Sequence, residues 1–138
     1  MSKVVWKGGT VRVNGIDLSD HVRSGHCTMA KDQVEDTGLN GPGLHTFLPG
    51  LANEGFQFTF ASDYDASQVN DILFQIYRNE DIVLVEMIPK PGAVSATNPN
   101  YSAHCQLFDH NAIDGDVGAL LTTPANFIAT EAIVRAET

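Results

Sequence analysis

The segment Gly55–Ala61, "GFQFTFA", gives the most direct indication of the fold class. Phenylalanine alternates with other residues along it, and successive side chains of a β-strand point to opposite faces of a sheet. The segment therefore predicts a strand whose phenylalanine face is buried in a core. Gln57 and Thr59 lie on the opposite face. The residues predicted to face the core are Phe56, Phe58 and Phe60.

The stretch just before this strand, Gln33–Asn53, reads "QVEDTGLNGPGLHTFLPGLAN". Its four glycines and two prolines break any helix, and its large apolar residues are unusual for a flexible linker. It lies between two predicted strands, His21–Lys31 and Gly55–Ala61, which predicts a long hairpin arm at about 33–53 with little regular pairing. Exposed apolar surface normally marks a partner site, whereas an arm folded over its own core is an equally good alternative. The residues expected to form the contact surface are Leu39, Leu44, Phe47, Leu48 and Leu51.

A single helix is predicted at about 66–79. Asp65 is a suitable N-cap, and Gln68 three residues later completes a capping box. Arg78 suits the negative end of the helix, and Asn79 can adopt the left-handed exit conformation. An apolar stripe at helical spacing requires a sheet to cover. The stripe consists of Val69, Ile72, Leu73 and Ile76.

The remaining chain predicts short strands separated by turns. Asn14-Gly15 suits a two-residue hairpin turn with positive φ. At 138 residues the chain fits one domain spanning 1–138. We therefore expect a mainly β fold, a β-sandwich or partial barrel of about seven or eight strands with one packed helix. The further strands are predicted at Ile82–Pro89, Tyr101–Phe108, Leu120–Ala129 and Ala132–Ala136.

Composition narrows the function classes. The chain has 17 acidic and 8 basic residues, a formal charge of −9, and no run of lysine or arginine. Stable binding to nucleic acid needs a basic surface, so this class is disfavoured. The start of the chain, "MSKVVWKGG", lacks an apolar stretch of signal-peptide length, and no apolar run is long enough to span a membrane. We expect synthesis and folding in a cytoplasm, with no membrane partner.

Candidate chemical sites have simple alternatives. The dipeptides His26-Cys27 and His104-Cys105 suggest zinc, but neighbouring residues on a strand point to opposite faces. Buried structural thiols beside surface histidines explain them better, and a mixed site stays conceivable. Asp109–Asp116, "DHNAIDGD", lacks the glycine and glutamate of an EF-hand loop and fits a turn. No catalytic motif is present, so we expect no catalytic residues, no cofactor and no metal; a triad assembled in space stays open.

The chain resembles the tail tube (major tail) proteins of long-tailed bacteriophages, in particular the small single-domain type of actinobacterial phages. The resemblance covers nearly the whole chain and lies in the order and spacing of its segments, not in one sharp motif. The His-Cys dipeptides and "DHN" depart from the family. The segments are "VRVNGIDLSDHV", "LPGL", "FASDYDASQVNDILFQIY", "VSATNPNYSA" and "DGDVGALLTTPANF".

The resemblance implies a structural virion protein. Hexameric rings would stack into a hollow tube that delivers DNA to the host, with arm 33–53 bridging rings and Gln57 and Thr59 facing the lumen. The negative charge suits a conduit that DNA crosses without stable binding. Further partners would be the tape measure, tail terminator and distal tail proteins. The alternatives are a ligand-binding β-sandwich module or another virion or secretion-tube component, such as a head–tail connector.

Overall fold

The computed structural model describes residues 3–138. Eight strands, one α-helix and one short 3-10 helix make up this part of the chain. The mainly β fold with one helix is therefore confirmed. The elements are β1 (Thr10–Val13), β2 (Ile16–Asp17), η1 (Ser19–His21), β3 (Val22–Glu35), β4 (Phe47–Ala61), α1 (Val69–Asn79), β5 (Val83–Ile88), β6 (Asn100–Leu107), β7 (Thr122–Ala129) and β8 (Val134–Ala136).

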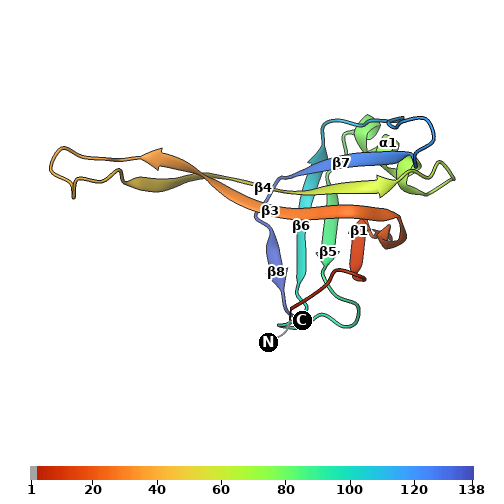
Figure 1. Cartoon of the computed structure of the whole chain (residues 1–138), viewed down its shortest axis with the longest axis horizontal. Coiled ribbons are helices and arrows are strands. Elements are labelled where there is room, and N and C mark those ends of the chain that lie inside the picture. Colours follow the sequence, from red (N-terminus) through yellow and green to blue (C-terminus); the bar gives the residue numbers. More distant parts are fainter. Residues whose placement is uncertain (1–2) are drawn as a thin grey trace.

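The strands form one antiparallel sheet in the order β2-β1-β5-β6-β7-β4-β3, with β8 beside β6. In Figure 1, β5 and β6 run across the direction of β7, β4 and β3. The two parts join where Cys105–Leu107 of β6 pairs with Phe127–Ala129 of β7. A single sheet folded across itself and left open matches the partial-barrel form of the prediction better than two separate sheets.

The core lies between the two parts of the sheet. Phe56, Phe58 and Phe60 are buried in it, as the alternation predicted. The Phe58 ring centroid lies 6.1 Å from that of Phe56, 5.4 Å from that of Phe60 and 6.2 Å from that of Phe127. Helix α1 adds its apolar stripe at the end of the body opposite the chain termini (Figure 1). The stripe residues buried in the core are Val69, Ile72, Leu73 and Ile76.

The first hairpin confirms the turn predicted from its dipeptide. Asn14 and Gly15 connect β1 to β2 with φ angles of 54° and 79°. Both residues of this tight turn need positive φ, which asparagine tolerates and glycine adopts without strain. The turn sets the register in which Val13 lies opposite Ile16.

The helix begins three residues later than predicted, and its N-cap is Gln68 instead of Asp65. The reason is a buried polar network. Asn70 donates to the Thr123 hydroxyl at 3.0 Å and accepts from the backbone N–H of Asp63 at 2.8 Å. These bonds hold the preceding residues in a turn, in which Ser67 has a φ of 61°. The left-handed exit residue is Glu80, with a φ of 56°, and not Asn79.

The arm is more regular than predicted. Gln33 pairs with Pro49, Val34 with Leu48 and Glu35 with Phe47, so the irregular segment shrinks to residues 36–46. Proline lacks an N–H, but β4 has no second neighbour in the arm, and an edge strand tolerates such a residue. The prediction of little regular pairing was therefore wrong for these residues.

Candidate assembly surfaces

The arm projects far from the body instead of folding over it (Figure 1). The alternative that it covers its own core is therefore wrong. The two arm strands are separated from the body strands by a register shift between Lys31 and Gln33. Such an irregularity increases the local twist of a ribbon. Gly50 lies in this region, where a Cβ atom would come within 3.0 Å of the Val34 Cγ2 atom.

The arm tip, residues 36–46, is held by its own polar groups. The Asp36 N–H donates to the Thr46 carbonyl at 3.0 Å, and the Thr46 hydroxyl donates to the Asp36 carboxylate at 2.7 Å. The His45 Nδ1 atom lies 2.7 Å from the Glu35 carboxylate, which also accepts from the Thr37 hydroxyl at 3.0 Å. These bonds, first that to His45 and then that to Thr37, lower the pKa of Glu35. The tip thus has a defined shape without a core of its own.

The predicted contact residues all lie on the outside of the arm. Leu39, Leu44 and Leu51 expose 99%, 71% and 79% of their surface, and Phe47 and Leu48 are also exposed. The sequence prediction omitted two exposed apolar neighbours, which the mixed pattern of β3 did not indicate. They are Met29 and Val34, of which Val34 lies directly opposite Leu48. Nothing within residues 3–138 covers the resulting apolar surface.

Gln57 and Thr59 lie on the face of the sheet away from the core. Gln57 is exposed and Thr59 is half-buried. Their neighbours across β3 and β7 continue this face. The strand side chains of this face include neither a carboxylate nor a lysine or arginine. Asp109, from the loop after β6, borders the same face beside Gln57 and Thr59. The outward face over β3, β4 and β7 consists of Ser24, His26, Thr28, Gln57, Thr59, Pro124, Asn126 and Ile128.

A second exposed apolar surface lies on the loop between β6 and β7, residues 108–121. This loop is exposed over most of its length and runs past α1 in Figure 1. The predicted turn is displaced: Asp109–Asp116 is irregular with a bend at Ala112–Ile113, and the hydrogen-bonded turn lies just after it, at Val117–Gly118. The prediction missed the apolar exposure of the loop, because single apolar residues among turn residues give no periodic pattern. The exposed side chains are Phe108, Ile113, Val117, Leu120 and Leu121.

Two pairs of a histidine with a carboxylate lie in the body. The His104 Nδ1 atom lies 2.7 Å from the Glu131 carboxylate at an exposed position, and the His21 Nε2 atom lies 2.9 Å from the Asp63 carboxylate at a half-buried one. The pKa of Asp63 is lowered, first by the Asp65 backbone N–H and then by His21. The His21–Asp63 pair ties the segment before α1 to η1. Within residues 3–138 no serine or cysteine is hydrogen-bonded to His21, so this pair is not part of a triad.

The two cysteines have different environments. Cys105 is buried, as predicted, and Cys27 is only half-buried. Burial is the main cause that raises the pKa of Cys27, and it raises that of Cys105 to about 12. His26 and His104 are exposed on the other face of their strands. Within residues 3–138, no group of three or more histidine, cysteine, aspartate or glutamate side chains could hold a metal ion.

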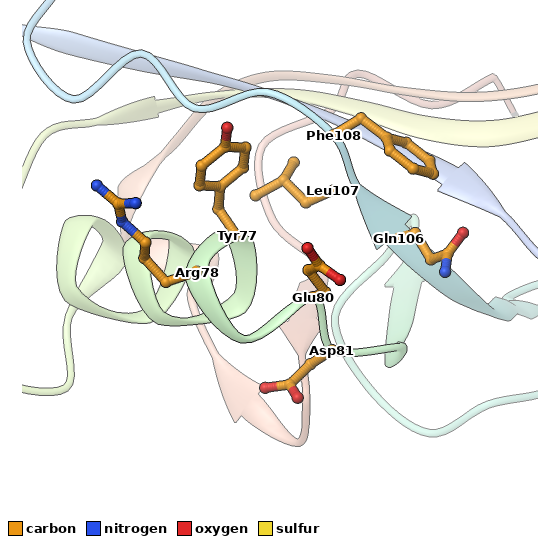
Figure 2. A pocket seen from close by; sticks show the side chains of 7 residues that line it. All are labelled: Tyr77, Arg78, Glu80, Asp81, Gln106, Leu107 and Phe108. Atoms are coloured by element: carbon orange, nitrogen blue, oxygen red, sulfur yellow. The ribbon is translucent and has the colours of Figure 1, made fainter.

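A hollow of about 490 Å³ lies between the end of α1 and β6. Figure 2 shows that its side chains point in different directions: Arg78 and Asp81 diverge, and the Phe108 ring turns away from Tyr77. Small-molecule sites instead place a few polar groups so that they converge on one point. This hollow therefore gives little support to a ligand-binding module. No helix within residues 3–138 is long and apolar enough to cross a membrane.

Solved structures with the same fold come from tail and virion particles. A chain in the virion of a native gene transfer agent particle matches with a TM-score of 0.76 and 11% identity, over 97% of this chain and 99% of that one. A chain in the tail of an empty gene transfer agent particle, computed with C6 symmetry, matches with a TM-score of 0.68 and 12% identity, over 84% and 82%. Hcp1 from Flavobacterium johnsoniae matches with a TM-score of 0.61 and 12% identity, over 94% and 95%. No protein-family model and no curated protein matches the sequence. The likeness is therefore one of fold.

Proposed function

We propose that this chain is the structural subunit of a phage-type tail tube. The observation that carries the proposal is the long ordered arm, whose apolar side chains no part of the described chain covers. Exposed apolar surface of this kind marks a contact with a partner. The likeness in fold to chains of a gene transfer agent virion and tail supports a partner of the same kind, another copy of this chain.

The proposed assembly is a hexameric ring that stacks into a hollow tube. The C6 symmetry used for the similar tail supports a ring of this order. Both end strands of the open sheet, β2 and β3, have an edge with which none of the described strands pairs. An unpaired edge can add a strand from another molecule. Ring formation would use such edges, and the arm would bridge to the next ring through Leu39, Leu44, Phe47, Leu48 and Leu51.

The outward face of β3, β4 and β7 is the proposed lumen surface. Gln57 and Thr59 lie at its centre. Their neighbours on β3 and β7 include no lysine or arginine, and Asp109 borders the face. A lining without lysine or arginine gives phosphates no ion pair, and a lining without large aromatic groups gives bases no stacking surface. DNA would therefore pass through the tube without stable binding.

The proposed location is the tail of a virion, after synthesis in the cytoplasm of a host bacterium. The other partners in this setting are the tape measure, tail terminator and distal tail proteins. The role is structural, with no catalytic step and no cofactor.

Electron microscopy of the purified full-length protein tests the proposal directly. We expect rings or tubes in negative stain. The matched variant replaces Thr37–His45 with Asn-Gly, which closes a two-residue hairpin turn between Asp36 and Thr46. It removes Leu39 and Leu44 but keeps both arm strands. We expect this variant to fold and to lose its tubes.

The outcomes separate the alternatives. A wild-type protein that stays monomeric at high concentration would contradict the tube proposal and favour a ligand-binding module. Normal tubes from the shortened variant would leave the tube proposal intact but would remove the tip from the stacking contact.

A further inference from the structure

The segment before β1, Lys3–Gly9, is fixed on the body by close packing. The Trp6 ring lies over Gly25 of β3, where an added Cβ atom would come within 3.2 Å of the indole and 2.9 Å of the Phe58 ring. Gly9 has a φ of 146°, and a Cβ atom there would lie 2.4 Å from the Ile88 carbonyl. Glycine is required at both positions, because any larger residue would push the segment off the body.

This anchored segment forms one wall of a shallow hollow of about 410 Å³. The opposite wall is the turn after β5. Apolar side chains, including the 76%-exposed Val5, line the hollow, and three of the eight basic residues of the chain surround them. The lining residues are Lys3, Val4, Val5, Lys7, Gly8, Pro89, Lys90 and Pro91.

Charge indicates which surface of the chain fits this hollow. The arm, residues 33–53, is apolar and acidic: it carries Glu35 and Asp36 and no lysine or arginine, and Asp32 and Lys31 lie at its base. The other exposed apolar surface, loop 108–121, carries three aspartates and no lysine or arginine. Opposite charge favours and orients a contact, whereas like charges facing each other oppose it. The arm therefore complements the basic apolar hollow and is repelled by the acidic apolar loop.

The arm cannot reach the hollow of its own chain. In Figure 1 the arm extends to one side of the body, and the N-terminal segment lies at the lower end. A contact between two different surfaces of identical chains is heterologous, and such contacts propagate into rings or filaments. Stacking of rings requires a contact of this kind.

We propose that the hollow formed by Lys3–Gly8 and Pro89–Pro91 receives the arm of a second copy of this chain. The inference rests on the proposed tube function and adds to it the surface on which the arm docks. The lysines would face the arm carboxylates, while Val4, Val5 and the prolines would cover arm leucines.

Cross-linking between two variants, each with one cysteine added to the native Cys27 and Cys105, tests the docking site. Asn40→Cys places a thiol at the arm tip, and Val5→Cys places one in the hollow. The two proteins are mixed, assembled and treated with a short bis-maleimide. We expect a covalent dimer. The matched rival pair is Asn40→Cys with Val117→Cys, whose thiol lies on loop 108–121 at a fully exposed position. We expect no dimer from this pair beyond the wild-type background of Cys27 and Cys105.

A charge reversal gives an independent measurement. Lys7→Glu should raise the protein concentration needed for tube formation by about tenfold or more, because it puts like charges against each other. Arg78→Glu makes the same change in charge on α1, at the other end of the body. It should change that concentration by less than about twofold, as expected for an isolated surface charge.

The outcomes distinguish the docking site from the tube itself. Two outcomes in assembled tubes would overturn the docking proposal and leave the tube proposal standing. In the first, the Asn40→Cys thiol cross-links to the Val117→Cys thiol; in the second, it cross-links to neither partner. Equal effects of Lys7→Glu and Arg78→Glu would also overturn it. A protein that forms no assembly under any condition would remove both proposals.

Discussion

The two halves of strand β4 contrast an apolar surface that the chain covers with one that it leaves open. The inner half contributes Phe56 and Phe58 to the core, whereas the outer half exposes Phe47 and Leu48 to solvent. The residue types are similar in both halves. Their neighbours differ, because the inner half lies between β3 and β7 and packs under the crossing strands, while the outer half pairs with β3 alone. Apolar content by itself therefore does not distinguish folding from association.

The backbone of β4 shows the same contrast. Gly55–Ala61 pairs with β3 on one side and with Thr122–Ile128 of β7 on the other, so both of its edges are hydrogen-bonded. In the arm one edge of each strand is free. Long, flat free edges promote aggregation, and a break in register or a proline reduces that risk. The register shift after Lys31 and the proline at position 49 lie in this region. The arm thus has features that restrict pairing with unrelated strands.

The largest loss of stability is expected from a charged side chain placed in the inner half of β4. Phe58→Lys should prevent folding, because an unpaired ammonium would be buried among aromatic rings. Phe58→Ala should fold and lose about 3–5 kcal/mol of stability through the cavity that it leaves. Circular dichroism and urea denaturation measure both effects. Phe47→Lys on the outer half is the matched control and should keep the native spectrum. A native, stable Phe58→Lys protein would contradict the assignment of the buried face.

Alanine substitutions in the outer half of β4 are expected to have a smaller effect, which is confined to assembly. Phe47→Ala and Leu48→Ala should change the free energy of unfolding by less than about 0.5 kcal/mol, as is usual for surface positions. Both should weaken tube formation, because each removes part of an apolar contact surface. Urea denaturation measures stability, and sedimentation measures the assembled fraction. A loss of stability equal to that of Phe58→Ala would show that the two halves do not differ in role.

The third prediction concerns the solvent face of the inner half. Gln57→Lys should leave folding and tube formation intact, because position 57 is exposed. It would add one positive charge per subunit to the proposed lumen, and neutralising phosphates releases counterions. DNA passage should therefore slow, most strongly at low salt. The measurement is the ejection rate from particles built with the variant at two salt concentrations.

Gln75→Lys is the matched control for this change. Position 75 lies on the exposed side of α1, where the present amide donates to Asp71 at 3.0 Å. This variant should leave ejection unchanged. Equal retardation by both variants would show that Gln57 does not face the channel.

The elements that sequence predicted well depend on local pattern. Alternation along Gly55–Ala61 and the Asn14-Gly15 turn each contain their own structural information. For the arm, the sequence named the apolar residues but left exposure and folding over the core equally open, and only the structure separates the two. The start of α1 was predicted wrongly, because Asn70 is drawn into a network with Thr123, a residue distant in sequence.

The hollow beside Lys3–Gly8 could not have been predicted from sequence. It depends on Trp6 lying over Gly25 and on Gly9 crossing the end of β5. Neither contact has a periodic signal, because each joins a short irregular segment to a distant strand. The arm surface could be predicted and its proposed docking surface could not, for this physical reason.

The smallest effect is expected from acid, which should loosen the arm tip and leave the inner half of β4 unchanged. Hydrogen bonds from His45 and Thr37 hold the pKa of Glu35 below its ordinary value of 4.5. A carboxylate with a lowered pKa stabilises the folded tip above that ordinary value, and this contribution is lost as pH falls through the folded pKa. Below about pH 4.5 the Thr46 amide should therefore lose protection against hydrogen exchange, after correction for the intrinsic rate, while the Phe58 amide keeps its protection.

The control for this prediction is Glu35→Gln, which keeps an acceptor oxygen at the tip but does not titrate. In this variant the protection of the Thr46 amide should no longer change between pH 6 and pH 3, about the range over which carboxylates titrate. If the Glu35→Gln tip loosens in acid as the wild type does, the Glu35–His45 contact does not control the shape of the tip.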